Sequence, residues 1–196
     1  KFSESDIANL NKEKCIEKIG VEKNNKKIIL VTCGSQGAKK INEVVMSMVE
    51  KYQEEDKYYI LVTGDKNYNE VMSLKAEAEK RIGKSLDNYI KIEKFIFNMD
   101  QMYKVADLCV TRAGAMTITE LEKIGKPAIF IPYPYAAENH QEYNARVLEK
   151  AGAAKVIVDK DLNGKTLDNI IIELKKDNKK LQEMGSKSRQ LSIDNV

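Results

Sequence analysis

The sequence KIILVTCGSQGA occupies positions 27–38, where an apolar, β-branched run passes into a glycine-containing loop and then into a helical pattern. This order predicts a strand, a tight loop and the start of a helix. The N-terminus of a helix carries unpaired backbone N–H groups and a partial positive charge, so it attracts anions. The loop therefore predicts a phosphate site, where the glycines allow a close approach of the backbone and Ser35 donates its hydroxyl. The same turn also occurs in any α/β sheet, and the glycine spacing of dinucleotide-binding proteins is absent.

Two further segments repeat this design. Residues 107–120 read DLCVTRAGAMTITE, a buried strand followed by a small-residue loop and a helix that opens with hydroxyls and a carboxylate. Residues 129–134 read IFIPYP and precede the helical pattern that starts at His140. Because loops at the carboxyl ends of neighbouring parallel strands meet in one crevice, we expect the three loops to share one ligand.

Short segments rich in Ile, Val and Tyr alternate with helical patterns along the chain. The predicted strands are 27–32, 58–63, 89–92, 107–111, 128–131 and 155–158. The predicted helices are 38–51, 67–82, 99–105, 116–124, 140–150 and a pair over 166–188. This alternation indicates an α/β fold, a Rossmann-like parallel sheet with helices on both faces. We expect a lead-in helix or linker over 1–25 and one domain over 26–196.

Composition argues against several classes of protein. The 196 residues carry 33 basic and 30 acidic side chains, and no basic run is interleaved with aromatics, so nucleic-acid binding is not expected. Cys15, Cys33 and Cys109 are widely spaced, which predicts neither a disulfide framework nor a zinc site. No signal peptide is visible, and no apolar stretch approaches the roughly 20 residues that span a bilayer. We therefore expect a soluble protein in a reducing, cytoplasmic compartment.

Several motifs follow one another in a fixed order: GSQGA at 34–38, FI at 95–96, RAGAMT at 112–117, HQ at 140–141 and GAA at 152–154. In this order they resemble the C-terminal half of the MurG family, two-domain GT-B glycosyltransferases that convert lipid I to lipid II in peptidoglycan synthesis. The resemblance implies that this half binds UDP-N-acetylglucosamine without a cofactor. It also implies that a missing N-terminal half binds the lipid I acceptor and associates with the cytoplasmic face of the bacterial cell membrane.

The resemblance implies a binding site for each part of the donor. The diphosphate would be bound by Gly34, Ser35 and Gln36. The uracil would contact Phe95, Ile96 and Met99, with the backbone of Ile96 reading the edge of the base. Glu120 would accept hydrogen bonds from the ribose hydroxyls, one helical turn beyond Met116 and Thr117 on the same face.

The remaining implied contacts involve the sugar and the phosphates. Thr117 and the backbone around Ala115 and Met116 would meet both groups, and His140 and Gln141 would hold hydroxyls of the N-acetylglucosamine. Arg112 ends a strand beside the same crevice, where it would either offset phosphate charge or serve a structural role.

Some of these residues also have a simpler interpretation. Glu120 would stabilise a helix dipole, and Phe95 would belong to the core. His140 is the only histidine, and histidine is the side chain most often used as a general base. The resemblance nevertheless places it with the donor sugar and assigns the general base to the N-terminal half. Asp159-Lys160-Asp161 has the Asp-x-Asp form of metal-diphosphate motifs, yet we expect it in a charged turn away from the three loops, with no metal.

Four other functions remain open from the sequence. The chain could be the soluble subunit of a two-chain UDP-N-acetylglucosamine transferase, or half of a glucosyltransferase that acts on diacylglycerol. It could also be a UDP-N-acetylglucosamine epimerase, although that chemistry needs an acid and a base, and the chain has one histidine. The last alternative is a nucleotide-binding module without enzymatic activity.

Overall fold

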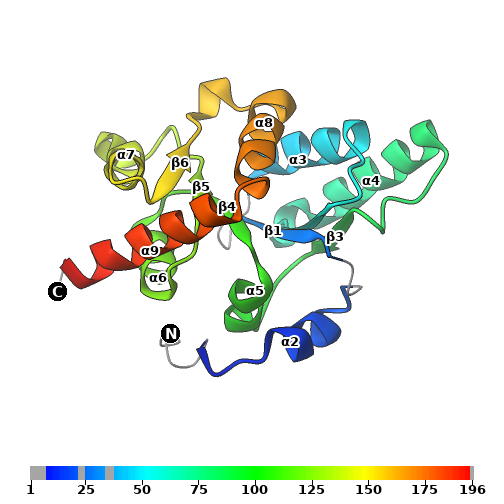
Figure 1. Ribbon diagram of the computed structural model, residues 1–196. Coiled ribbons are helices and arrows are strands. Elements are labelled where there is room, and N and C mark those ends of the chain that lie inside the picture. Colours follow the sequence, from blue (N-terminus) through cyan, green and yellow to red (C-terminus); the bar gives the residue numbers. More distant parts are fainter. Residues whose placement is uncertain (1–7, 22–24, 34–37, 195–196) are drawn as a thin grey trace.

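The computed structural model describes residues 8–21, 25–33 and 38–194, which contain one six-stranded parallel sheet (Figure 1). The strands lie in the order β3-β2-β1-β4-β5-β6. Their bounds are β1 Lys27–Thr32, β2 Lys57–Val62, β3 Ile90–Glu93, β4 Leu108–Thr111, β5 Ala128–Phe130 and β6 Ala154–Val156. The strand order reverses between β1 and β4, the point where Rossmann-like sheets bind ligands beyond the carboxyl ends of their strands. The predicted α/β, Rossmann-like fold is confirmed.

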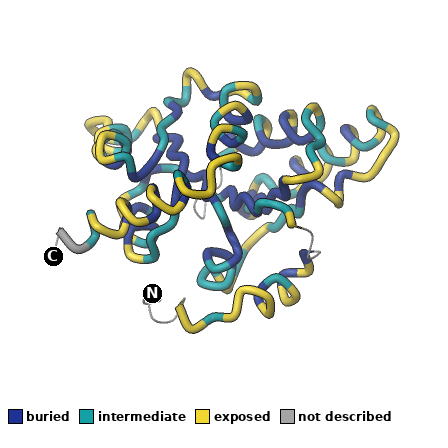
Figure 2. Tube along the Cα trace, in the orientation of Figure 1, coloured by how far each residue is buried: buried dark blue, intermediate teal, exposed yellow. Residues whose placement is uncertain are grey.

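Helices cover both faces of the sheet because successive side chains of each buried strand point to opposite sides. Ile29 and Val31 of β1 pack on one side, and Ile28 and Leu30 pack on the other. The first side is covered by α3 (Lys39–Lys51), α4 (Tyr68–Ile82) and α8 (Gly164–Lys175). The second side is covered by α2 (Lys12–Ile19), α5 (Met99–Val105), α6 (Ala115–Ile124) and α7 (His140–Lys150). Figure 2 shows the strands buried between these two layers.

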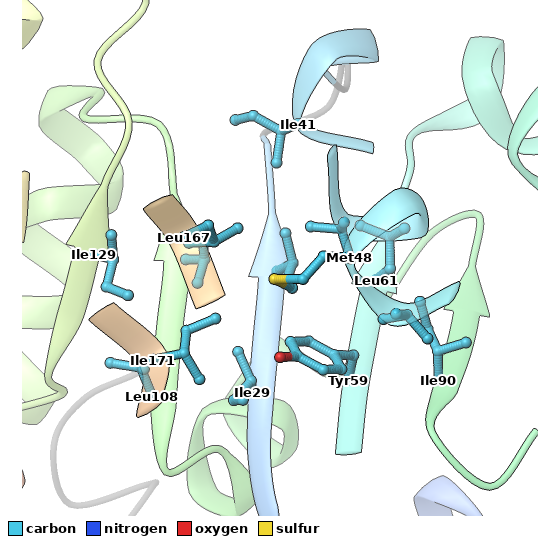
Figure 3. Close-up of a cluster of buried hydrophobic side chains, with 14 of the residues drawn as sticks. Ile29, Ile41, Met48, Tyr59, Leu61, Ile90, Leu108, Ile129, Leu167 and Ile171 are labelled. Carbon is cyan, nitrogen blue, oxygen red and sulfur yellow. The ribbon is translucent and has the colours of Figure 1, made fainter. Parts of the chain in front are cut away.

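The core of the first side is a continuous apolar layer (Figure 3). Ile41 and Met48 of α3 and Ile171 of α8 belong to this layer together with strand residues such as Tyr59 and Ile29. Short 3₁₀ turns connect other elements: η1 Asp65–Asn67, η2 Ala137–Asn139 and η3 Asp159–Asp161. The ends of the predicted strands and helices differ from the observed ends by at most two residues, except that the last helix continues to Asp194 rather than ending at 188.

The helix α2 lies within the segment 1–25 that precedes the first strand. The side chain of Asn11 accepts a hydrogen bond from the backbone of Lys14, and Gly20 ends the helix in the left-handed region at φ 70°. Cys15 and Ile19 are buried and belong to the core of the second side. The described part of this segment therefore packs with the sheet.

The last helix, α9 (Asn178–Asp194), crosses the amino edge of the sheet. Leu181 and Met184 pack with the core of the first side, and Leu191 packs against the core of the second. The helix lies beside α6 (Figure 1). A Cβ atom at Gly185 would overlap the carbonyl oxygen of Gly125, the residue that ends α6. The two backbones thus approach more closely than any larger residue would allow at position 185.

A buried ion pair joins the start of β2 to α8. Lys57 is 1% exposed, and its Nζ lies 2.6 Å from Oδ1 of Asp168, which is also buried. Glu54 lies 3.3 Å from the same Nζ. Burial and the neighbouring carboxylates raise the pKa of Tyr59, whose hydroxyl has no hydrogen-bond partner among the described residues. The pair is a fixed polar contact within an otherwise apolar face.

We expect Lys57→Met to lower the free energy of unfolding by about 3–5 kcal/mol, because it leaves Asp168 charged and unpaired inside the core. The double variant Lys57→Met/Asp168→Leu should recover most of that loss, since an apolar pair of similar volume needs no counter-charge. Urea unfolding of the two single variants and the double variant measures the coupling. Lys66→Met, at an exposed position, is the control and should change stability by about 0.5 kcal/mol or less. A double variant no more stable than Lys57→Met would contradict this account.

Candidate functional site

The candidate site lies at the carboxyl edge of the sheet. The three residues expected to bind the diphosphate, Gly34, Ser35 and Gln36, lie outside the described residues. Cys33 directly precedes them and is buried, and burial raises the pKa of its thiol to about 12. The thiol is therefore protonated at neutral pH and is not a nucleophile.

The loop after β4 leads directly into α6. Gly114 precedes the first turn, and no side chain caps that turn. Ala115 and Met116 are exposed, while Thr117 is half-buried. The N-terminus of α6 therefore presents uncapped backbone N–H groups at the edge where the site was expected.

Glu120 lies in the second turn of α6 and is half-buried. Its Oε2 accepts a hydrogen bond from the Tyr103 hydroxyl at 3.4 Å. Tyr103 belongs to α5, and its pKa is raised by burial and by the carboxylate. This contact fixes the carboxylate between α5 and α6, so Glu120 has a defined position as well as a favourable place near a helix N-terminus.

Arg112 is committed to contacts within the protein. Its Nη1 donates to the backbone oxygens of Ile131 at 3.1 Å and Pro132 at 3.0 Å, and to Oδ1 of Asp159 at 2.8 Å. The guanidinium also lies 5.6 Å from the centre of the Tyr133 ring. Of the two roles expected for Arg112, the geometry favours the structural one, because it joins the ends of β4 and β5 to the turn after β6.

The expected position of the Asp159 turn was wrong. It does not lie away from the three loops, since Asp159 contacts Arg112 after β4 and Lys40 at the start of α3. Lys40 Nζ bonds both Oδ2 of Asp159, at 3.0 Å, and its backbone oxygen. Burial would raise the pKa of Asp159, but the hydrogen bonds from Arg112 and Lys40 hold it below its usual value. The spacing of Arg112 and Asp159 in the sequence did not predict this contact, because only the strand order brings the segment after β6 near the end of β4.

The loop after β5 is shaped by two residues in the left-handed region, Glu138 at φ 50° and Asn139 at φ 55°. Oε1 of Gln141 accepts from the backbone N–H of Tyr133 at 3.0 Å, so its amide NH₂ group remains as a donor. Nδ1 of His140 lies 2.6 Å from the carbonyl oxygen of Ala137. A carbonyl only accepts, so Nδ1 carries the proton and the neutral ring keeps Nε2 as an acceptor.

The residues expected to contact a base follow β3. Phe95 is 50% exposed and stacks on Phe97 with ring centres 6.4 Å apart, so the interpretation of Phe95 as a core residue is wrong. Ile96 and Met99 are partly buried against the core of the second side. The aromatic ring of Phe95 is therefore accessible at the same edge of the sheet as Glu120.

Neither a metal-binding cluster nor a membrane-spanning helix occurs among the described residues. Within residues 8–21, 25–33 and 38–194, no three His, Cys, Asp or Glu side chains gather as a metal site. In the same ranges no helix has the length and apolar character needed to cross a membrane.

Comparisons with known proteins agree with this geometry. The model of the glycosyltransferase family 28 C-terminal domain matches residues 28–195. The chain belongs to this family. A family 28 relative from Halothermothrix orenii, named UDP-N-acetylglucosamine–N-acetylmuramyl-(pentapeptide) pyrophosphoryl-undecaprenol N-acetylglucosamine transferase, is 44% identical over 94% of this chain and 49% of its own length. A relative of the same name from Finegoldia magna is 39% identical over 93% of the chain and 47% of its own length.

Solved structures extend the comparison. MurG from Acinetobacter baumannii superimposes with a TM-score of 0.74 at 28% identity, covering 94% of this family 28 chain and 50% of its own. The C-terminal CMP-Kdo binding domain of WaaA, from the same organism, shares the fold with a TM-score of 0.67 at 10% identity, covering 95% of this chain and 97% of its own. The chain spans about half the length of the curated relatives it matches. It has the fold of the C-terminal half of a GT-B glycosyltransferase.

We expect Asp159→Asn to lower the free energy of unfolding by about 1–3 kcal/mol at pH 7, because it weakens two charged hydrogen bonds. A carboxyl whose pKa is lowered in the folded state stabilises above its unfolded pKa, and this contribution disappears as the pH falls through the folded pKa. The difference between wild type and variant should therefore shrink below about pH 4. Chemical unfolding at several pH values measures it. The control is Asp161→Asn, in the exposed part of the same turn; an equal loss there would refute the argument.

Proposed function

We propose that this chain is the donor-binding half of an inverting N-acetylglucosaminyltransferase, which holds UDP-N-acetylglucosamine while the sugar is transferred to lipid I to form lipid II. The observation that carries the proposal is the start of α6, where uncapped N–H groups lie one turn before a carboxylate held by Tyr103. An anion and a pair of ribose hydroxyls are the groups that this arrangement suits. The names of the relatives that are 44% and 39% identical support the choice of donor and acceptor.

The rest of the donor would extend from this point along the carboxyl edge. The uracil would lie at Phe95 and Ile96, with Met99 beside it, and the diphosphate would lie against the N-terminus of α6 and the loop with Ser35. The sugar hydroxyls would meet the free amide donor of Gln141 and the Nε2 acceptor of His140. Gln141 and His140 thus offer a donor and an acceptor to the sugar hydroxyls.

Transfer would proceed by displacement at the anomeric carbon, with the acceptor hydroxyl entering opposite the diphosphate. Negative charge builds on the diphosphate as the bond breaks, and fixed N–H groups aimed at that charge lower the barrier without reorganising. Arg112 is held by Asp159 and by the backbone oxygens of Ile131 and Pro132, so Arg112 would position the loops rather than meet the leaving group. The N-terminal half would bind lipid I, remove the proton and contact the cytoplasmic face of the membrane.

Glu120→Ala should weaken UDP binding by about 1–3 kcal/mol, because it leaves the ribose hydroxyls without an acceptor. Titration calorimetry with UDP and with 2′- and 3′-deoxy-UDP measures this loss. The deoxy analogues should bind wild type less tightly than UDP does, and should lose little further in the variant. Glu77→Ala, on the distant helix α4, removes the same charge and should leave the affinity unchanged. Equal further losses with the deoxy analogues would show that Glu120 does not touch the ribose.

The isolated chain should bind UDP-N-acetylglucosamine but show no turnover with lipid I. EDTA should leave this binding unchanged, because helix N-termini serve in place of a metal.

Fusion to the N-terminal half of the Halothermothrix orenii relative should restore transfer, and His140→Ala should then raise the donor KM roughly three- to tenfold with little change in kcat. The kcat profile against pH should keep its ionisation near neutrality in this variant. Loss of that ionisation would make His140 the catalytic base.

A further inference from the structure

An open cavity of about 770 Å³ lies at the amino edge of the sheet, opposite the candidate donor site. The first residue of β1, the turns before β4 and β5, and one side of α9 form its wall. Pockets that hold small organic ligands have volumes of about 300–1,000 Å³. The cavity is therefore large enough for a ligand bigger than a simple inorganic ion.

Positive charge dominates this amino-edge cavity. Lys12, Lys27, Lys126 and Arg189 line it, and Asp107 is the one carboxylate among its described lining residues. Both oxygens of Asp107 are engaged: Oδ1 lies 3.1 Å from Lys12 Nζ, and Oδ2 accepts from the backbone N–H of Ile28 at 2.9 Å. No acidic side chain in the described part of the chain forms an ion pair with Lys27 or Lys126. The lining thus has three more positive than negative groups.

Lys126 is the most constrained of these cations. It is half-buried between Gly125 and Pro127, and its Nζ donates to the backbone oxygen of Ala106 at 2.7 Å. That bond uses one of the three ammonium hydrogens and supplies no negative charge. Burial lowers the pKa of Lys126, and the opposing effect of Asp107 does not reverse this, so the charged form is only partly compensated within the protein. An anion beside it would complete that compensation.

We propose that the amino-edge cavity binds a phosphorylated small molecule, with Lys27 and Lys126 holding the phosphate. A phosphate group offers several acceptor oxygens and up to two charges, which suits the ammonium groups of Lys27 and Lys126, neither of which pairs with an acidic side chain among the described residues. Asn178 and Gln182 of α9 also line the cavity, and their amides supply both donors and acceptors for the hydroxyls or the base of the ligand. This site is separate from the donor site, because the two lie at opposite edges of the sheet.

Amide chemical shifts of the ¹⁵N-labelled chain, titrated with pyrophosphate, test the proposal. Saturable shifts are expected at Gly125, Ser186 and neighbouring residues that line the cavity. Shifts at Thr117 and Glu120 would report separately on binding at the donor site. Lys27→Met and Lys126→Met should each lower the pyrophosphate affinity, as measured from the amino-edge shifts, about tenfold. Lys126→Arg keeps the charge and should retain most of the affinity. Lys123→Met is the control: it removes the same charge from the exposed last turn of α6, outside the cavity lining, and should have little effect.

Three outcomes would overturn the proposal. Pyrophosphate shifts confined to the donor edge would show that the cavity binds no phosphate. Equal weakening by Lys123→Met and Lys126→Met would show that only the overall charge matters. Retained affinity in Lys27→Met and Lys126→Met, with spectra that show folded protein, would remove both lysines from the site. If Lys126→Met does not fold, Lys27→Met and Lys126→Arg decide the question in the same way.

Discussion

Because all six strands run parallel, every segment that follows a strand leaves the sheet at the same edge. This constraint brings together groups that are far apart in the chain. Arg112 after β4 meets Asp159 after β6, and Tyr133 after β5 packs against the same guanidinium. The segments after β4, β5 and β6 are consequently joined to one another through the contacts of Arg112. The amino edge receives only chain returning from helices, and α9 lies across it.

The charged groups at the carboxyl edge are held in fixed positions by contacts within the protein. Arg112 and Lys40 share the single carboxylate of Asp159, so one of their two positive charges is balanced inside the protein. The uncapped N-terminus of α6 is not balanced in this way, and it leaves partial positive charge at the mouth of the site. An anion bound at this helix N-terminus, as we propose, would meet fixed backbone N–H groups. Such groups lose little conformational freedom when a ligand binds.

The sequence predicted the fold well because each strand is a short apolar run bounded by turn residues. Gly125 before Lys126-Pro127, for example, marks the end of α6 clearly, and the structure ends that helix at Ile124. Contacts between elements were harder to predict, because they depend on the strand order. Asp159 was expected far from Arg112, yet the two are 47 positions apart in the chain and 2.8 Å apart in space. The buried ion pair of Lys57 and Asp168 could not be predicted for the same reason. In the sequence each residue is typical of an exposed charge, and only the packing of α8 against β2 brings the two together.

The contact between Gly125 and Gly185 has a consequence for the order in which the chain can fold. Gly185 follows Gly125 only after α7, β6 and α8, so α9 leaves the ribosome well after the helix on which it docks. Until then Leu181 and Met184 cannot cover their part of the core, and the amino edge of a partly made domain exposes apolar surface. Such surface is prone to aggregate and attracts chaperones. The time for which this apolar surface stays exposed during synthesis therefore depends on the length of chain between these two glycines.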